Sequence, residues 1–342
     1  MVAGHTLDAL LAPEARAHPG VAIYWQARGF TAPLFLVAAG WALSVSTARS
    51  GARGLTVWSV RLPRVALLAV VGLALRWPGW GIDGLLRLDP EPWRHLLAFD
   101  VLQTIAVGLL VSSAVLALPL GRGRALVAFA LLACASLVAA WSVPPPRQPS
   151  GLAAIAAEQA VGGTSPFPLF PWLAYLFGGV ALGLAAGEGG RRTALAVAAA
   201  GAMLVLPFAI LSPGDFAPAH PVLVGLRLGA VLLLLALLFA VPRGAARAVA
   251  PLGRASLAVY ALHVPAVYGW STVQGLAGRI GTSLGPWEAL FLAAAVLAAS
   301  LAAARLLAAA RGASARTLRR AGEAAGALAA RLREPRAPER TR

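Results

Sequence analysis

Long apolar runs separated by short polar connections dominate this chain. Each run has about 17–21 residues, or comes close once its flanking turns are added, and a helix of that length crosses about 30 Å of hydrocarbon. The nine full runs are Thr31–Thr47, Val65–Trp77, Val101–Leu120, Ala125–Val143, Phe170–Gly187, Thr193–Leu211, Val222–Val241, Ala255–Ser271 and Trp287–Leu307. Met1–Leu11 is apolar but only about half as long, and is expected to be the back end of a tenth span. The pattern predicts an all-α, polytopic membrane helix bundle of about ten transmembrane helices, the first truncated at its N-terminus.

The composition agrees with a membrane protein. Of the 342 residues 59% are hydrophobic and 12% charged, and the mean hydropathy is +0.76. A soluble domain cannot bury that much apolar surface. The single cysteine, Cys134, lies within an apolar run, which leaves neither an internal disulfide nor a cysteine metal site.

The basic residues are divided unevenly between the two sides of the predicted bundle. All 29 are arginine, and 20 of them lie in alternate connections and in the segment from Arg311 onward. The positive-inside rule places that side, with both chain ends, in the cytoplasm. The chain is therefore expected to be a multi-pass protein of the cell (inner) membrane, in contact with membrane lipids. Its net charge of +16 indicates topology rather than a nucleic-acid partner.

Two regions are expected. Residues 1–307 form the transmembrane domain, and 308–342 form a basic cytoplasmic tail that is amphipathic on the anionic inner leaflet or disordered. Within the domain, Pro144–Pro166 is a Pro- and Gly-rich connection, of a length typical of functional or disordered loops.

Ionisable side chains within apolar runs are the first functional candidates in a membrane protein. A neutral imidazole at His5 is suited to take a proton from an attacking hydroxyl or amine. Asp8 lies three residues on, on the same helical face, where it could orient the ring. The alternative is that His5 only forms a hydrogen bond to a neighbouring helix.

A basic pair, Arg61 and Arg64, precedes the second full apolar run. Guanidinium groups bind phosphate bidentately, so the pair is a candidate clamp for a phosphorylated cytosolic donor. The alternative is snorkelling toward lipid phosphate.

Four further polar residues are candidates for an acceptor site or the bundle interior. Asp100 is predicted to cap the helix that starts at Val101, and Gln103 lies one turn further on. His263 is a functional group or an interhelical hydrogen-bond partner, and Arg227 is a ligand or a snorkelling residue. No standard metal-ligand spacing occurs, and no metal is expected.

Several motifs resemble those of membrane acyltransferases with about ten spans. Such proteins carry a His in the first helix, Arg-x-x-Arg entering the third and a late Ser-Leu-x-x-Tyr-x-x-His helix. Further segments are similar to bacterial relatives of heparan-α-glucosaminide N-acetyltransferase. The matching positions are His5, Arg61 with Arg64, Ser256–His263, Arg28–Phe35, Phe99–Ile105 and Phe167–Leu173, and the resemblance covers residues 1–305.

The resemblance implies transfer of an acyl group, expected to be acetyl, from cytosolic acyl-CoA (acetyl-CoA) to an extracytoplasmic amino sugar or other glycan. It implies His5 as the base, with Asp8, and Arg61 and Arg64 as donor-binding residues. Acyl-CoA is a co-substrate, and no tightly bound cofactor is expected. The alternative function is a transporter or flippase of a lipid-linked or small polar compound, although no inverted repeat is visible.

Overall fold

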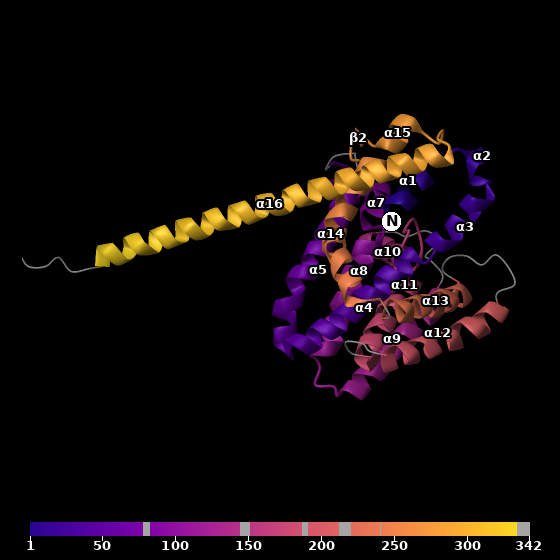
Figure 1. The fold of residues 1–342 in the computed structure, drawn as a ribbon, viewed down its shortest axis with the longest axis horizontal. Helices are drawn as coiled ribbons and strands as arrows, with labels where there is room; N and C mark the ends of the chain where they lie inside the picture. Colours follow the sequence, from indigo (N-terminus) through magenta and orange to yellow (C-terminus); the bar gives the residue numbers. More distant parts are fainter. Residues whose placement is uncertain (78–82, 144–150, 187–190, 212–219, 240, 334–342) are drawn as a thin grey trace, which may run out of the picture.

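The computed structural model describes residues 1–77, 83–143, 151–186, 191–211, 220–239 and 241–333, which form a helical bundle with one short hairpin (Figure 1). The helices of the first half are α1 (Val2–Leu10), α2 (Pro13–Arg16), α3 (Pro19–Arg28), α4 (Thr31–Ser50), α5 (Leu55–Leu75), α6 (Asp83–Leu86), α7 (Pro90–Leu97), α8 (Val101–Ala117) and α9 (Arg122–Ser142). Those of the second half are α10 (Leu152–Val161), α11 (Leu169–Ala186), α12 (Arg191–Leu211), α13 (Pro221–Phe239), α14 (Arg243–Tyr268), α15 (Leu276–Ile280) and α16 (Pro286–Arg333). Strands β1 (Gly269–Trp270) and β2 (Val273–Gln274) pair antiparallel between α14 and α15.

The predicted all-α polytopic bundle is confirmed. Six helices of the described part are long and apolar enough to cross a membrane, namely α4, α5, α9, α11, α13 and the first 26 residues of α16. A seventh span is obtained if α7 and α8, which meet at a bend of 66°, are taken together. The described part of each of the nine apolar runs lies mainly on a helix, although α14 begins in the basic stretch at Arg243 and the described apolar part of α12 is short.

Two boundaries differ from the pattern of apolar residues. Helix α5 begins at Leu55, ten residues before the apolar run, so Arg61 and Arg64 lie inside the helix rather than at its start. The connection between α9 and α11 contains a helix, α10, where the sequence indicated only a loop. Apolar periodicity marks where a helix contacts hydrocarbon, and it does not mark the polar turns that extend it.

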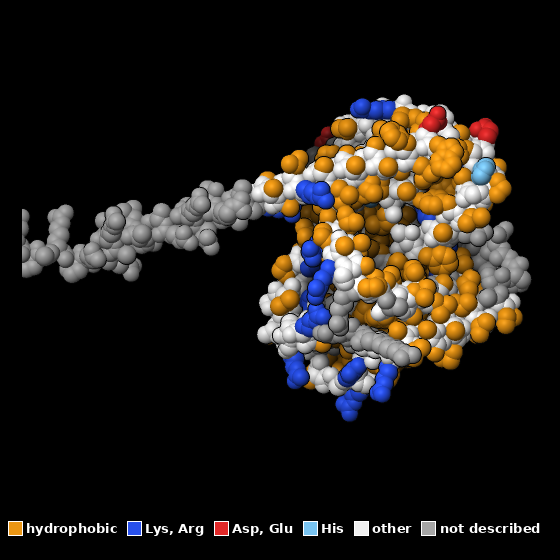
Figure 2. Space-filling model, in the orientation of Figure 1, with side chains coloured by type: hydrophobic (Ala, Val, Ile, Leu, Met, Phe, Trp, Pro, Cys, Tyr) orange, Lys and Arg blue, Asp and Glu red, His pale blue; other side chains and the backbone are white. Residues whose placement is uncertain are grey.

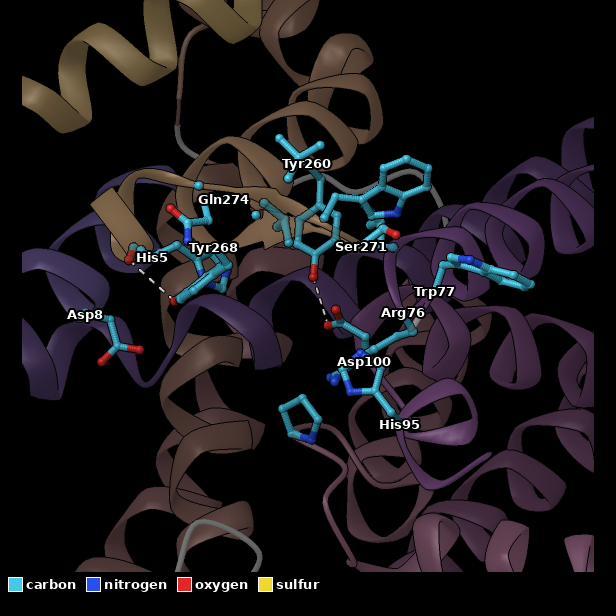
Figure 3. Close-up of a pocket in the computed structure, with 18 of the residues that line it drawn as sticks. His5, Asp8, Arg76, Trp77, His95, Asp100, Tyr260, Tyr268, Ser271 and Gln274 are labelled. Atoms are coloured by element: carbon cyan, nitrogen blue, oxygen red, sulfur yellow. Dashed lines mark hydrogen bonds between the residues drawn. The ribbon is translucent and has the colours of Figure 1, made fainter. Parts of the chain in front are cut away.

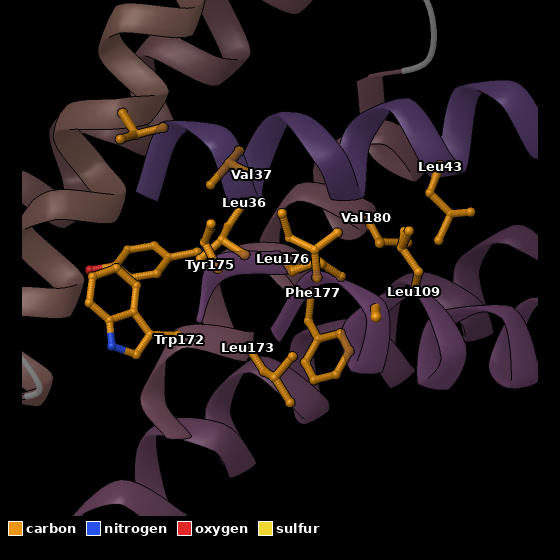
Figure 4. Packing of buried hydrophobic residues seen from close by; sticks show 14 of the residues in the cluster. Leu36, Val37, Leu43, Leu109, Trp172, Leu173, Tyr175, Leu176, Phe177 and Val180 are labelled. Carbon is orange, nitrogen blue, oxygen red and sulfur yellow. The ribbon is translucent and has the colours of Figure 1, made fainter. Parts of the chain in front are cut away.

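The core lies where α4, α8 and α11 pack together (Figure 4). Leu36 and Val37 of α4 face Leu176 and Val180 of α11, and all four side chains are almost fully buried. Small residues let the two backbones meet: a Cβ at Gly40 would overlap the carbonyl of Leu176. In a bilayer, helix association depends on such close packing because lipid is as apolar as leucine.

The N-terminal helix α1 is held in the bundle by two helices of the C-terminal half. Helix α1 packs against α14 and α16, and α16 passes over them before it continues beyond the bundle (Figure 1). The end of α1 also forms a bridge from Leu11 to Leu284, with Ala12 N–H donating to the Leu284 carbonyl at 2.9 Å. These contacts fix the position of His5.

Charge is distributed unevenly over the visible face (Figure 2). Most of the blue arginine side chains gather in the lower part of the view, where α5, α9 and the start of α14 lie. The red acidic groups lie at the opposite end, around α2 and α15. Hydrophobic side chains cover much of the surface between them, as expected of a surface that faces lipid.

Candidate active site

A cavity of about 800 Å³ lies at the end of the bundle where α1, α8, α14 and the β1–β2 hairpin meet. Its wall includes His5, Asp8, Asp100 and Tyr260 (Figure 3). Tyr260, Val264 and Tyr268 all line it because a spacing of four residues keeps side chains on one face of α14. The hairpin closes part of the cavity with Trp270 and Gln274.

His5 is oriented by Tyr268. The Nδ1 atom of His5 lies 3.1 Å from the Tyr268 hydroxyl, and that hydroxyl donates a longer bond of 3.4 Å to the His5 carbonyl. A hydroxyl that donates to the carbonyl is free to accept from Nδ1–H, which leaves the lone pair on Nε2. With the proton on Nδ1, Nε2 is the ring atom that can accept a proton.

The carboxylate of Asp8 contacts two arginines, and its role in orienting the His5 ring stays a prediction. Its carboxylate forms an ion pair with Arg28 at 3.4 Å and a longer one with Arg16 at 3.9 Å. The side chain of Asp8 lies near the Tyr268 hydroxyl. The same hydroxyl contacts the ring nitrogen Nδ1 of His5. Asp8 thus anchors α1 to the C-terminal ends of α2 and α3.

Arg28 is placed by two contacts at once. Its guanidinium group pairs with Asp8 and lies 4.9 Å from the ring centroid of Trp25, a cation–π distance. The resemblance drew attention to this residue only as part of a motif, and the structure places it in the wall of the 800 Å³ cavity.

The predicted cap at Asp100 is confirmed, and Gln103 completes it. Asp100 Oδ1 accepts the Val101 N–H at 2.6 Å, while Gln103 Oε1 accepts the Asp100 N–H at 3.1 Å. The same Oδ1 accepts a bond of 2.8 Å from the hydroxyl of Tyr260, across the α8–α14 contact. One carboxylate therefore fixes the start of α8 and its position against α14.

His263 is fully buried beside His5, with 5.3 Å between the ring centroids. Its Nδ1 lies 2.7 Å from the carbonyl of Val259, one turn earlier on its own helix, instead of forming the interhelical bond that the sequence left open. Within the described part of the chain, Nε2 has no hydrogen-bond partner. His263 thus contributes ring packing against His5 and Tyr260.

Arg61 and Arg64 line a separate cavity of about 290 Å³. Arg61 donates a bond of 2.9 Å to the hydroxyl of Thr47 on α4, which holds its guanidinium group in place, and Arg64 is exposed. The remaining wall is mostly apolar and includes Leu102 of α8 and Leu257 of α14.

The two cavities lie at successive levels of the same helix pair. On α8, Asp100 lines the larger cavity and Leu102 the smaller one; on α14, Tyr260 lines the larger and Leu257 the smaller. One helical turn separates these positions on α14, which is about 5 Å along the helix axis. Residues of α8 and α14 thus line both cavities, with His5 in the wall of the larger one and the arginine pair in the wall of the smaller one.

Arg227 lines neither of these cavities, although its own cavity shares His5 with the larger one. It lines a third cavity of about 440 Å³, whose wall also includes Trp25, Trp172 and His5. In the parts of the chain that the structure describes, no three or more His, Cys, Asp or Glu residues are grouped so that they could hold a metal ion.

Tyr268 and Arg76 were missed by the search of the apolar runs. Tyr268 is uncharged. Arg76 lies at the C-terminal end of the apolar run Val65–Trp77, where an arginine is grouped with the connection that follows, and it is the C-cap residue of α5. The i, i+4, i+8 series that starts at Tyr260 is the signal that would have identified Tyr268.

No curated protein and no solved structure matched the chain. The acyltransferase domain family matches residues 1–305, which covers every element of the bundle described above apart from the later part of α16. The chain therefore belongs to the acyltransferase domain family and is a membrane acyltransferase.

Proposed function

We propose that the protein transfers an acyl group, which we take to be acetyl, from cytosolic acyl-CoA to a hydroxyl or amine of an extracytoplasmic glycan. The observation that carries this proposal is that His5 and the arginine pair line two cavities at successive levels of α8 and α14. Such an arrangement suits a donor and an acceptor that approach from opposite sides of a membrane.

The donor side is the cavity of Arg61 and Arg64. The arginine-rich end of the bundle is cytoplasmic by the positive-inside rule, and that is where acyl-CoA is made available. Two guanidinium groups suit the phosphates of CoA, and an apolar cavity beside them suits its extended arm. The arm would carry the thioester along α8 and α14 toward His5.

The chemistry at His5 is proton transfer to and from one ring nitrogen. Nε2 takes the proton of the acceptor hydroxyl or amine while the oxygen or nitrogen of that group forms a bond to the thioester carbonyl carbon. The carbon–sulfur bond then breaks, and the thiolate of CoA takes the proton back from the imidazolium. Tyr268 acts as a positioning residue that keeps Nδ1–H directed away from the acceptor.

The acceptor side is the 800 Å³ cavity, which is large enough for one or two sugar rings. Its polar groups come from several separate elements, among them α1, α3, α7 and α14, and Trp77 and Trp270 add apolar surface. An amino sugar is one acceptor that such a site would take, as the similarity of several segments to relatives of heparan-α-glucosaminide N-acetyltransferase suggests.

The test is acyl transfer by the purified protein in lipid nanodiscs, with radiolabelled acetyl-CoA and a panel of amino sugars and neutral glycans. We expect His5→Ala to lower kcat by about 10²–10⁴-fold, the usual contribution of a general base. Arg61→Ala should raise KM for acetyl-CoA with a smaller change in kcat.

Two matched variants serve as controls. His18→Ala removes an exposed histidine that lines neither cavity, and Arg53→Ala removes an exposed arginine just before α5. Both should retain wild-type transfer. Full acyl transfer by His5→Ala would overturn the proposal. Uptake of a glycan by the wild type without acyl transfer would favour a transporter.

A further inference from the structure

One guanidinium group in the wall of the 800 Å³ cavity makes no hydrogen bond or ion pair with any described residue. It belongs to Arg76, which follows the last turn of α5 and is half-buried. The backbone N–H of Arg76 bonds to the end of α5, so the residue is fixed while its side chain remains available. An unpaired, partly buried cation is costly unless a ligand supplies an anion.

The carboxylates nearest to Arg76 in the cavity wall already have partners. Asp8 is paired with Arg28 and Arg16, and Asp100 accepts bonds from Tyr260 and from the start of α8. Neither carboxylate forms an ion pair with Arg76 in the described structure, so its guanidinium group lies in the cavity wall without an anionic partner there.

The position of Arg76 suits a ligand that also reaches His5. Arg76, Trp77 and His95 lie on one side of the cavity, and His5 with Tyr268 lies on the other (Figure 3). The Trp270 indole N–H donates a bond of 2.6 Å to the Ala74 carbonyl, two residues before Arg76. The hairpin is thereby tied to the end of α5, which keeps this side of the cavity in one arrangement.

We propose that Arg76 binds an anionic substituent of the acceptor, so that the enzyme selects an acidic glycan. A carboxylate, a phosphate or a sulfate on the sugar would pair with the guanidinium fork while a hydroxyl or amine of the same molecule faces His5. This inference rests on the proposed function, because it assigns this cavity to the acceptor. Arg76 is a specificity-determining residue and takes no part in proton transfer.

Binding of small probes to the full-length protein in nanodiscs tests the proposal without any acyl donor. The probes are methyl β-D-glucuronide, glucose 6-phosphate and the neutral methyl β-D-glucoside, and titration calorimetry measures each Kd. We expect at least one charged probe to bind about tenfold or more tightly than the neutral one, since a hydrogen bond to a charged group contributes that much. The charged probe that binds more tightly identifies the anion.

Arg76→Gln should abolish the preference for the charged probe while leaving the affinity for the neutral one within about twofold, since only the ionic bond is lost. Arg76→Lys keeps the charge without the fork and should retain part of the preference. Arg87→Gln is the matched control, because Arg87 is exposed and lies outside the cavity. Equal binding of all three probes by the wild type, or an unchanged preference in Arg76→Gln, would overturn the proposal.

Transfer assays separate this proposal from the one on which it rests. If the wild type acetylates an acidic acceptor, Arg76→Gln should raise KM for that acceptor about tenfold or more and leave kcat and the KM of a neutral acceptor nearly unchanged. Charge-selective binding without any acyl transfer would support the anion site and contradict the acyltransferase mechanism. Efficient acyl transfer that does not depend on Arg76 would support the acyltransferase mechanism and contradict the anion site.

Discussion

The hydroxyl of Tyr260 donates a hydrogen bond of 2.8 Å to Oδ1 of Asp100, and this bond joins residues 160 positions apart. Both residues line the cavity that contains His5, and both are largely buried. The bond fixes the distance between α8 and α14, the two helices that connect that cavity with the arginine pair. The geometry of the proposed site therefore depends on a contact that neither helix makes alone.

Replacement of Tyr260 by Phe should loosen this contact and lower stability. A hydrogen bond to a charged group contributes about 1.5–3 kcal/mol, and Asp100 would keep only its bonds to the start of α8. The measurement is the midpoint of thermal unfolding in detergent. Tyr24→Phe, which removes a hydroxyl from half-buried Tyr24 on α3, is the control and should leave the midpoint unchanged. An equal midpoint for Tyr260→Phe and the wild type would contradict the predicted role of the bond.

Replacement of Tyr268 by Phe should lower kcat while the protein stays folded. The ring of His5 would lose the partner of Nδ1, and one hydrogen bond is worth about 1 kcal/mol, so we expect roughly a fivefold to tenfold loss. The KM for acetyl-CoA should not change, because Tyr268 lies outside the arginine-lined cavity. Steady-state kinetics at several donor concentrations provide the test, and a rise in donor KM with an unchanged kcat would contradict a positioning role.

The fold was predictable because hydrophobic length carries most of the information in a membrane protein. The run Thr31–Thr47 lies within α4, and the described part of the run Phe170–Gly187 lies within α11, since most residues of these helices are apolar. The start of α5 and helix α10 were not predictable in this way. Their ends are set by polar and tertiary contacts, which leave no apolar period in the sequence.

The site was predictable in its residue types and less so in its pairings. Asp100 and Gln103 form the cap that their spacing indicates, because a cap is local. The partner of His5 was not recoverable from nearby sequence, because Tyr268 is 263 positions away. Asp8 was the natural choice by spacing, but a carboxylate near two arginines pairs with them.

We expect Gln159 of α10 to stabilise the protein. This fully buried side chain accepts hydrogen bonds on Oε1 from the Thr164 N–H at 3.1 Å and the Ser165 hydroxyl at 2.9 Å. Ser165 in turn accepts the Phe99 N–H, immediately before the cap of α8. Gln159→Leu would leave these donors without their acceptor, at a cost of about 1–3 kcal/mol.

The thermal midpoint and the limited-proteolysis pattern of Gln159→Leu measure this effect. Ala153→Gln, at an exposed position of the same helix, is the matched control and should behave as the wild type. A Gln159→Leu protein as stable as the control would show that α10 does not support the start of α8.

Two adjacent glycines of α11 provide a sharp test of the packing against α4. A Cβ at Gly179 would overlap the backbone carbonyl of Val37, whereas a Cβ at Gly178 would meet only the side chain of Leu228 at 3.7 Å. Gly179→Ala should therefore destabilise the protein by the upper part of the roughly 1–3 kcal/mol range for overpacking, because a backbone cannot turn aside as a side chain can. Gly178→Ala should be neutral or stabilising by up to about 1 kcal/mol, since alanine favours a helix over glycine. Thermal midpoints of the two variants in the same detergent make the comparison, and equal midpoints would contradict the close approach of α4 and α11 at Gly179.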